Sequence, residues 1–278
     1  MFNIANLLTS MNLICGMLSI LFCFSGQLDF AVYAIFSGAL FDFADGFVAR
    51  KFNLISDLGK QLDSLSDLVT FGIAPGFLMF FMIILGVDSS TLIEASSKNQ
   101  TFYEYYVIQE FFTWVNATFY DIPNKFDASI KYLPFMACFI PFFALFRLAK
   151  FNIDKQQTKN FIGFPTPLTA IIFSFFPLYF AINMESWSKE LELIHVTFDC
   201  YTLAVIVLLF SSCMLMPFPL MSLKIQKTNP KENQLKLFFI LISIISIPFL
   251  KVLSIPFILT LYFIVSIYHS FKITKDEI

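Results

Sequence analysis

Four aspartates stand at regular spacing in an otherwise apolar stretch of the sequence. They are Asp42, Asp45, Asp63 and Asp67, and they follow the pattern D-x2-D-G-x2-A-R-x8-G-x3-D-x3-D. Residues three, four, seven or eight positions apart share one face of an α-helix. The spacing therefore predicts two helices, joined by a polar connection at about 50–56, that aim two carboxylates each at a shared point.

Carboxylates inside a membrane need a partner that offsets the free-energy cost of their charge. An ionised carboxylate there costs at least ~2.5–3.5 kcal/mol, and several close together raise one another's pKa values and become protonated. Divalent cations remove both obstacles, because carboxylate oxygens are the ligands that Mg²⁺ and Mn²⁺ prefer. We therefore interpret the four aspartates as a two-metal site for phosphoryl transfer.

Three further residues of the pattern fit a phosphate-containing ligand. Gly46 and Ala49 share the face of the first two aspartates and leave room for a bulky group. Arg50, at the end of the same predicted helix, can direct two N–H groups at a phosphate.

Thr9 and Asn12 share a face of the first apolar helix. From spacing alone this pair either lines the site or joins helices by hydrogen bonds.

The composition is that of a membrane protein. Of the 278 residues, 58% are hydrophobic and 14% charged, and phenylalanine alone occurs 39 times. These values predict an all-α, polytopic integral membrane bundle with about eight transmembrane helices. The net charge of -2 offers no basic surface for nucleic acid, so we expect no nucleic-acid partner.

The predicted organisation is a single membrane domain over 1–278, with one insertion and one added helix pair. The core covers 1–86 and 131–220, an insertion over 87–130 lies at the extracytoplasmic interface, and a C-terminal helix pair covers 235–272. The expected helices span about 4–24, 30–50, 59–86, 132–150, a fifth reaching 183, 199–217, 237–250 and 252–271.

Charge distribution predicts the orientation. With eight spans and an internal N-terminus, 13 of the 18 lysines and arginines fall in cytoplasmic loops. The aspartates and both termini are then expected to face the cytoplasm, in the inner (cytoplasmic) membrane.

The pattern of eight fixed positions resembles the signature of the CDP-alcohol phosphotransferases, integral membrane enzymes that make phospholipids. The resemblance implies a six-helix core, here with two additional C-terminal helices, two divalent cations (Mg²⁺ or Mn²⁺) and a homodimer. It implies metal binding by Asp42, Asp45, Asp63 and Asp67, with Asp67 also the catalytic base. It implies a CDP-lipid site formed by the following residues: Thr9, Asn12, Gly46, Ala49, Arg50 and Gly59.

A second resemblance narrows the acceptor. RLAKFN, followed by the segment F-x-G-F-P-T-P, is similar to a pattern of the membrane-embedded phosphatidylserine synthases. It implies transfer of a phosphatidyl group from CDP-diacylglycerol to L-serine with release of CMP. The acceptor pocket is then expected from Arg147, Asn152, Gly163 and Thr166. Arg147 suits the serine carboxylate because a guanidinium pairs well with a carboxylate, although it can instead anchor its helix through the aspartates.

Two alternatives remain open from the sequence. Another acceptor, such as glycerol 3-phosphate, would use the same metal motif, because the motif handles only the CDP-lipid. A divalent-cation transporter would also carry intramembrane carboxylates, but it would need acidic groups near the midplane, whereas these aspartates cluster toward one surface.

Overall fold

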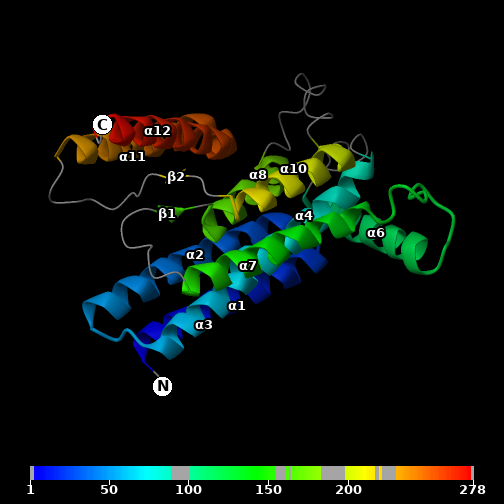
Figure 1. Ribbon diagram of the computed structural model, residues 1–278. Helices are drawn as coiled ribbons and strands as arrows, with labels where there is room; N and C mark the ends of the chain where they lie inside the picture. The colour runs from blue at the N-terminus through cyan, green and yellow to red at the C-terminus, as the bar shows by residue number, and fades with distance from the viewer. Residues whose placement is uncertain are drawn as a thin grey trace.

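The computed structural model describes residues 3–88, 100–153, 161–162, 164–182, 198–216, 219–220 and 230–276. Within these ranges the chain is a helical bundle, as the composition predicts (Figure 1). The exception is a two-residue antiparallel ladder between β1 (Phe161–Ile162) and β2 (Pro219–Leu220).

The first two helices form a closely packed pair. The helix α1 (Ile4–Phe24) begins at Asn3, whose side chain accepts a hydrogen bond from the backbone N–H of Asn6 at 2.7 Å. A short turn leads into α2 (Leu28–Lys51). Gly26 in this turn has a φ of 78°, a conformation that favours glycine.

The next span contains the second aspartate pair and is not a uniform helix. It consists of α3 (Asp57–Asp67), a π-helical turn (Leu68–Ile73), α4 (Ala74–Leu85) and a final 3₁₀ turn (Gly86–Asp88). The prediction of one continuous helix over 59–86 therefore missed the wide turn. Pro75 gives a physical reason, because its ring would collide with the carbonyl group four residues earlier in a regular α-helix.

The predicted insertion contains a helix, α6 (Gln100–Phe119), which packs against one end of α4 (Figure 1). Trp114 of this helix lies edge-on to Phe80 at 5.0 Å between ring centroids and donates a hydrogen bond to the carbonyl of Lys131 at 2.8 Å. Lys125 forms an ion pair with the buried Glu110 at 2.7 Å. The part of the insertion at 89–99 lies outside the described residues.

Three more helices complete the core. A 3₁₀ segment (Leu133–Cys138) leads into α7 (Phe139–Ile153), and α8 (Thr166–Ile182) and α10 (Cys200–Cys213) follow. The predicted helix at 199–217 is therefore longer than the observed α10.

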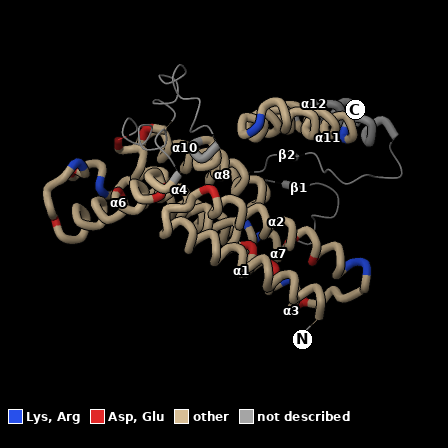
Figure 2. Tube along the Cα trace, turned by 180° about the vertical axis from the view of Figure 1, so that it is seen from behind, with Lys and Arg blue, Asp and Glu red and all other residues tan. Residues whose placement is uncertain are grey.

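The C-terminal pair consists of α11 (Pro230–Leu250) and α12 (Ser254–Asp276), joined by a short turn (Lys251–Leu253). Both helices extend beyond their predicted outer limits at 237 and 271. Figures 1 and 2 show this hairpin beside the bundle.

Five segments of the described chain are long and apolar enough to cross a membrane. They are Ile4–Phe24, Leu28–Lys51, Asp57–Asp88, Leu133–Ile153 and Lys236–Ser266. Two shorter apolar helices cover Thr166–Tyr179 and Cys200–Cys213. In the central segment, Asp57–Asp88, 72% of the most apolar 18-residue stretch is buried, against 22–33% for the other four. This burial belongs mainly to α4, since Ser66 is the one buried residue of α3.

Candidate active site

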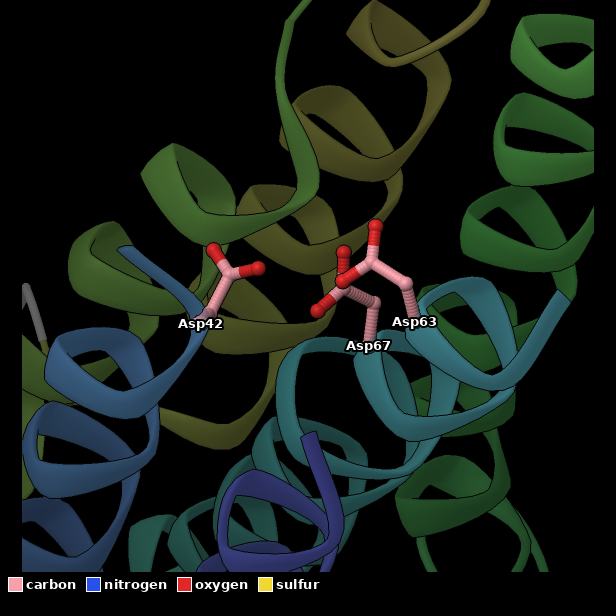
Figure 3. Close-up of side chains that lie close together, drawn as sticks. All are labelled: Asp42, Asp63 and Asp67. Atoms are coloured by element: carbon pink, nitrogen blue, oxygen red, sulfur yellow. The ribbon is translucent and has the colours of Figure 1, made fainter. Parts of the chain in front are cut away.

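Three of the four aspartates converge between α2 and α3. The carboxylates of Asp42, Asp63 and Asp67 each offer an oxygen, and these oxygens all lie within 4.8 Å of one another. Figure 3 shows Asp42 on α2 facing Asp63 and Asp67 on α3. Asp63 and Asp67 are four residues apart, so one face of α3 presents both side chains. The predicted convergence of the two helices on one point is therefore visible in the structure.

The environment of these carboxylates fits a divalent cation. Three like charges this close repel one another strongly in a low-dielectric setting. In addition, Oδ1 of Asp63 is buried and has no hydrogen-bond partner among the described residues. A buried acceptor without a donor is costly unless a cation or a water satisfies it. Hard oxygen ligands of this kind suit Mg²⁺ or Mn²⁺.

Asp45 lies apart from this cluster. Its carboxylate accepts a short hydrogen bond from the hydroxyl of Thr9 on α1, and its side chain is buried. The same hydroxyl also contacts the carbonyl oxygen of Ala5 at 3.1 Å. Asp45 therefore links α2 to α1, and its predicted role as a metal ligand stays a prediction.

Asn12, the second residue of the predicted pair on α1, reaches the cluster directly. Its side-chain amide donates a hydrogen bond to Oδ1 of Asp67 at 3.1 Å. Asn12 is fully buried, and its own Oδ1 has no hydrogen-bond partner among the described residues. The two polar residues on α1 thus hold one aspartate each, Asp45 through Thr9 and Asp67 through Asn12.

A pocket of about 100 Å³ opens beside the cluster, between α1, α2 and α3. Its lining includes four of the residues predicted for the CDP-lipid, together with Asp45 and Asp63: Thr9, Gly46, Ala49 and Gly59. Asn6 and Lys60, a further candidate for contact with a phosphate, also line it. The pocket thus brings these small and polar residues to the side of the carboxylate cluster.

At two places around this pocket a glycine makes room for a neighbouring side chain. A Cβ atom at Gly46 would lie 3.3 Å from a terminal nitrogen of Arg50, whose guanidinium folds back over the glycine. A Cβ atom at Gly59 would lie 3.1 Å from the hydroxyl of Ser56, which caps α3. Arg50 thus reaches the pocket edge from the end of α2.

Arg147 lies inside the bundle, on α7, with only 9% of its surface exposed. Its Nε–H donates a short hydrogen bond to the carbonyl of Phe164, and its guanidinium lies 5.9 Å from the ring centre of Phe151. The helix α7 that carries Arg147 packs against α3 and the π-helical turn, which flank Asp67. A buried cation is therefore held beside the carboxylate cluster by the segment that precedes α8.

The other residues predicted for the acceptor pocket are placed differently. Asn152 exchanges hydrogen bonds with Ser64 on α3, at 2.9 Å and 3.2 Å, so it joins the end of α7 to the aspartate helix. Thr166 is buried at the first position of α8. Gly163 lies outside the described residues.

Sequence reasoning missed two further polar residues. Ser66 and Thr70 are buried, and both donate to carbonyls of α1. A signal for them existed, because positions 63, 66, 67 and 70 form one helical stripe.

Comparison with known proteins agrees with this geometry. Residues 2–96 match the family model described as CDP-alcohol phosphatidyltransferase. These residues include every described residue of the carboxylate cluster and its pocket.

Three relatives extend the similarity beyond that region. A CDP-diacylglycerol–serine O-phosphatidyltransferase from Bacillus subtilis is 31% identical over 182 residues, covering 64% of this chain and 79% of the relative. An archaetidylserine synthase from Methanothermobacter thermautotrophicus is 29% identical over 62% of this chain and 57% of its own length. A CDP-diacylglycerol–serine O-phosphatidyltransferase from Helicobacter pylori J99 is 28% identical over 60% of this chain and 54% of its own length.

Proposed function

This chain belongs to the CDP-alcohol phosphatidyltransferase family, and from that premise we propose that it transfers the phosphatidyl group of CDP-diacylglycerol to the hydroxyl of L-serine, releasing CMP. The observation that carries the proposal is the convergence of Asp42, Asp63 and Asp67 within 4.8 Å, next to a pocket lined by the small residues of the same motif. The names of the relatives support serine as the acceptor.

Each residue of the motif has its own role in the proposed reaction. Asp42, Asp63 and Asp67 would hold the divalent cations, with Asp45 as a further ligand. When bound, such cations neutralise a pyrophosphate and stabilise the departing phosphate oxygen as a Lewis acid. Gly46 and Ala49 give the CDP group access, and Arg50 contributes two N–H donors to a phosphate oxygen.

In the proposed reaction the serine hydroxyl oxygen attacks the phosphorus that carries the diacylglycerol. A new P–O bond forms, the bond to the CMP oxygen breaks, and CMP leaves with the electron pair. Asp67 takes the hydroxyl proton on a carboxylate oxygen, and the amide of Asn12 orients that carboxylate.

Arg147 is proposed to bind the carboxylate of the acceptor serine. The Nε–H of Arg147 is engaged by the carbonyl of Phe164. Its terminal N–H groups would therefore donate hydrogen bonds to the carboxylate of the serine near Asp67. A charge-assisted pair in this buried place is strong, because no water competes for the donors.

We also propose that the site and both chain ends face the cytoplasm, where serine is available and CMP can be released. Both views of the chain support the same side of the membrane for the two termini. The N- and C-terminus lie toward the end of the bundle where α2 stops and α3 begins (Figures 1 and 2). Reporter fusions at either terminus should report the same cytoplasmic location. The homodimer implied by the family resemblance is a further proposal, to be tested by the mass of the protein in detergent.

The decisive experiment measures CMP release from CDP-diacylglycerol by the purified protein. Parallel reactions contain L-serine, glycerol 3-phosphate, inositol 1-phosphate or no acceptor, each with Mn²⁺, Mg²⁺ or EDTA. We expect release only with serine and a divalent cation, and its loss in Asp67→Asn. Asp121→Asn is the matched control, because Asp121 is an exposed carboxylate that follows α6 and does not belong to the cluster.

Each alternative outcome has a defined meaning. Release with glycerol 3-phosphate alone would keep the metal site and reject serine as the acceptor. Cation flux into liposomes without turnover of CDP-diacylglycerol would favour a transporter. Release that survives EDTA would contradict the metal-dependent mechanism.

A further inference from the structure

Two hydroxyl groups of the aspartate span reach across to the backbone of α1. Ser66 donates to the carbonyl oxygen of Thr9 at 2.9 Å, and Thr70 donates to the carbonyl oxygen of Asn12 at 2.8 Å. Ser66 is 3% exposed and Thr70 is fully buried. Both hydroxyls therefore form interhelical hydrogen bonds inside the bundle.

This behaviour departs from that of most other helical hydroxyls in the described chain. Serine and threonine in a helix commonly bond to the carbonyl four residues earlier in the same helix. Ser37 and Ser174 do so, each at 2.8 Å. Ser66 and Thr70 instead use the second lone pair of carbonyls that belong to another helix.

The acceptors on α1 are the backbone groups of the residues that hold two aspartates. The side chain of Thr9 bonds to Asp45, and the side chain of Asn12 bonds to Asp67. One short stretch of α1 thus contacts α3 through its carbonyls and the aspartates through its side chains. Any slip of α3 along α1 would change both sets of contacts together.

The donors lie on the same face of the span as the clustered carboxylates. Positions 63, 66, 67 and 70 follow the spacing of one helical stripe. Ser66 therefore stands between Asp63 and Asp67 along the helix, and Thr70 stands one turn beyond Asp67, at the start of the π-helical turn. The two hydroxyls bracket the carboxylate Asp67.

Thr70 is also enclosed by two helices at once. A Cβ atom added at Gly16 on α1 would lie 2.6 Å from the hydroxyl oxygen of Thr70. One added at Gly38 on α2 would lie 2.6 Å from its methyl group. Both glycines thus allow their helices to approach Thr70 closely, which fixes the position of the helical span that carries Asp67.

We propose that Ser66 and Thr70 are positioning residues, which set the register of α3 against α1 so that Asp63 and Asp67 meet Asp42. The link to catalysis rests on the proposed function, while the link to metal binding rests on the carboxylate cluster alone. Neither hydroxyl touches a substrate in this scheme. Each acts through the carboxylates that it aligns.

The test compares Ser66→Ala and Thr70→Val with wild type. Valine keeps the branched shape of threonine and removes only the hydroxyl, and Thr70→Ser restores the hydroxyl without the methyl group. Ser174→Ala is the matched control, because that buried hydroxyl bonds within α8. Electron paramagnetic resonance measures Mn²⁺ binding to the detergent-purified proteins without any lipid substrate.

We expect Ser66→Ala and Thr70→Val each to weaken Mn²⁺ binding by about three- to tenfold, the factor that one net hydrogen bond represents. Thr70→Ser and Ser174→Ala should stay near the wild-type affinity. In the CMP-release assay the half-activating Mn²⁺ concentration should rise by a similar factor, while the KM for L-serine changes less than twofold.

The proposal would be overturned if both hydroxyl-deleting variants bound Mn²⁺ as tightly as wild type, whether or not their melting temperature fell. A wild-type protein that binds no Mn²⁺ would also overturn it. If Thr70→Val fails to fold, Ser66→Ala decides the matter by itself. Absence of CMP release in wild type would reject the proposed function, while the Mn²⁺ titration would still decide the positioning role.

Discussion

Asp45 belongs to the same spaced pattern as Asp42, yet the two carboxylates have different partners. Asp42 joins the cluster, whereas Asp45 bonds to Thr9. If the hydroxyl of Thr9 acts by orienting Asp45, removing either partner should remove the same interaction.

A double-mutant cycle tests this coupling. Thr9→Val and Asp45→Asn should each lower CMP release, and the double variant should lose less than the sum of the two effects. We expect a coupling free energy of about 0.5–3 kcal/mol, measured from kcat/KM at saturating metal. Strict additivity would show that Thr9 and Asp45 act independently.

Arg147 offers a second test at the level of one side chain. Lysine retains the charge but cannot give two parallel N–H donors to a carboxylate. We expect Arg147→Lys to raise the KM for L-serine by about tenfold or more while the metal requirement stays unchanged. A raised requirement for Mn²⁺ with an unchanged KM would instead assign Arg147 to the support of Asp67.

At the scale of the elements, the π-helical turn joins a polar helix to an apolar one. Gly16 of α1 packs against this turn so tightly that a Cβ atom would lie 2.9 Å from the backbone Cα of Thr70. Backbone atoms cannot rotate away as a side chain can, so α1 and the turn would have to separate.

We therefore expect Gly16→Ala to destabilise the protein by about 1–3 kcal/mol and to weaken Mn²⁺ binding. Thermal unfolding in detergent and the Mn²⁺ titration measure the two effects. Gly72→Ala is the comparison, because its nearest neighbour is the Cβ atom of Ala144 at 3.1 Å, a milder contact on the other side of the turn. A Gly16→Ala protein with wild-type melting and metal affinity would contradict this account.

Sequence reasoning predicted the elements that depend on local spacing. The convergence of α2 and α3 followed from aspartates repeated at three and four residues, and the membrane character followed from composition. The contacts of Ser66, Thr70 and Asn12 could not be predicted in the same way. They depend on how far α1 is shifted along α3, and nothing in the spacing within either helix specifies that shift.

The wide turn shows a similar limit. Pro75 signals a disturbance of the helix, but a proline permits a kink, a break or a π turn. Gly16 and Gly38, which lie on other helices, let those helices approach Thr70 in this turn, and the spacing within the span does not show these contacts. The boundaries of α10, α11 and α12 also differ from prediction. Apolar residues continue past the end of α10, whereas α11 and α12 extend into polar segments that a search for apolar stretches leaves out.

At the scale of the whole molecule, α6 stands at the end opposite the aspartate end of the bundle (Figure 2). Its attachment depends on polar as well as aromatic contacts. Glu110 is 6% exposed and pairs with Lys125 at 2.7 Å. A buried carboxylate that loses its partner is costly.

Lys125→Met should accordingly lower stability by roughly 1–3 kcal/mol, since the buried carboxyl group of Glu110 would lose its ion-pair partner. Adding Glu110→Gln should recover part of the loss, because an amide is easier to bury than a carboxylate. CMP release per folded molecule should remain at the wild-type level, which separates this attachment from the site. Melting temperature in detergent and specific activity provide the two readings.

The enclosure of the aspartate span has a consequence for the lipid environment. Helices in contact with lipid respond to a thinner or thicker bilayer by tilting, at a cost of fractions of a kcal/mol per Å of mismatch. Here the apolar helix α4, which continues the span beyond Asp67, is almost entirely buried, so its neighbours are mainly other helices, and the outer spans take up the mismatch. An enzyme whose product alters the composition of its own membrane would in this way keep its carboxylates in register while that membrane changes around it.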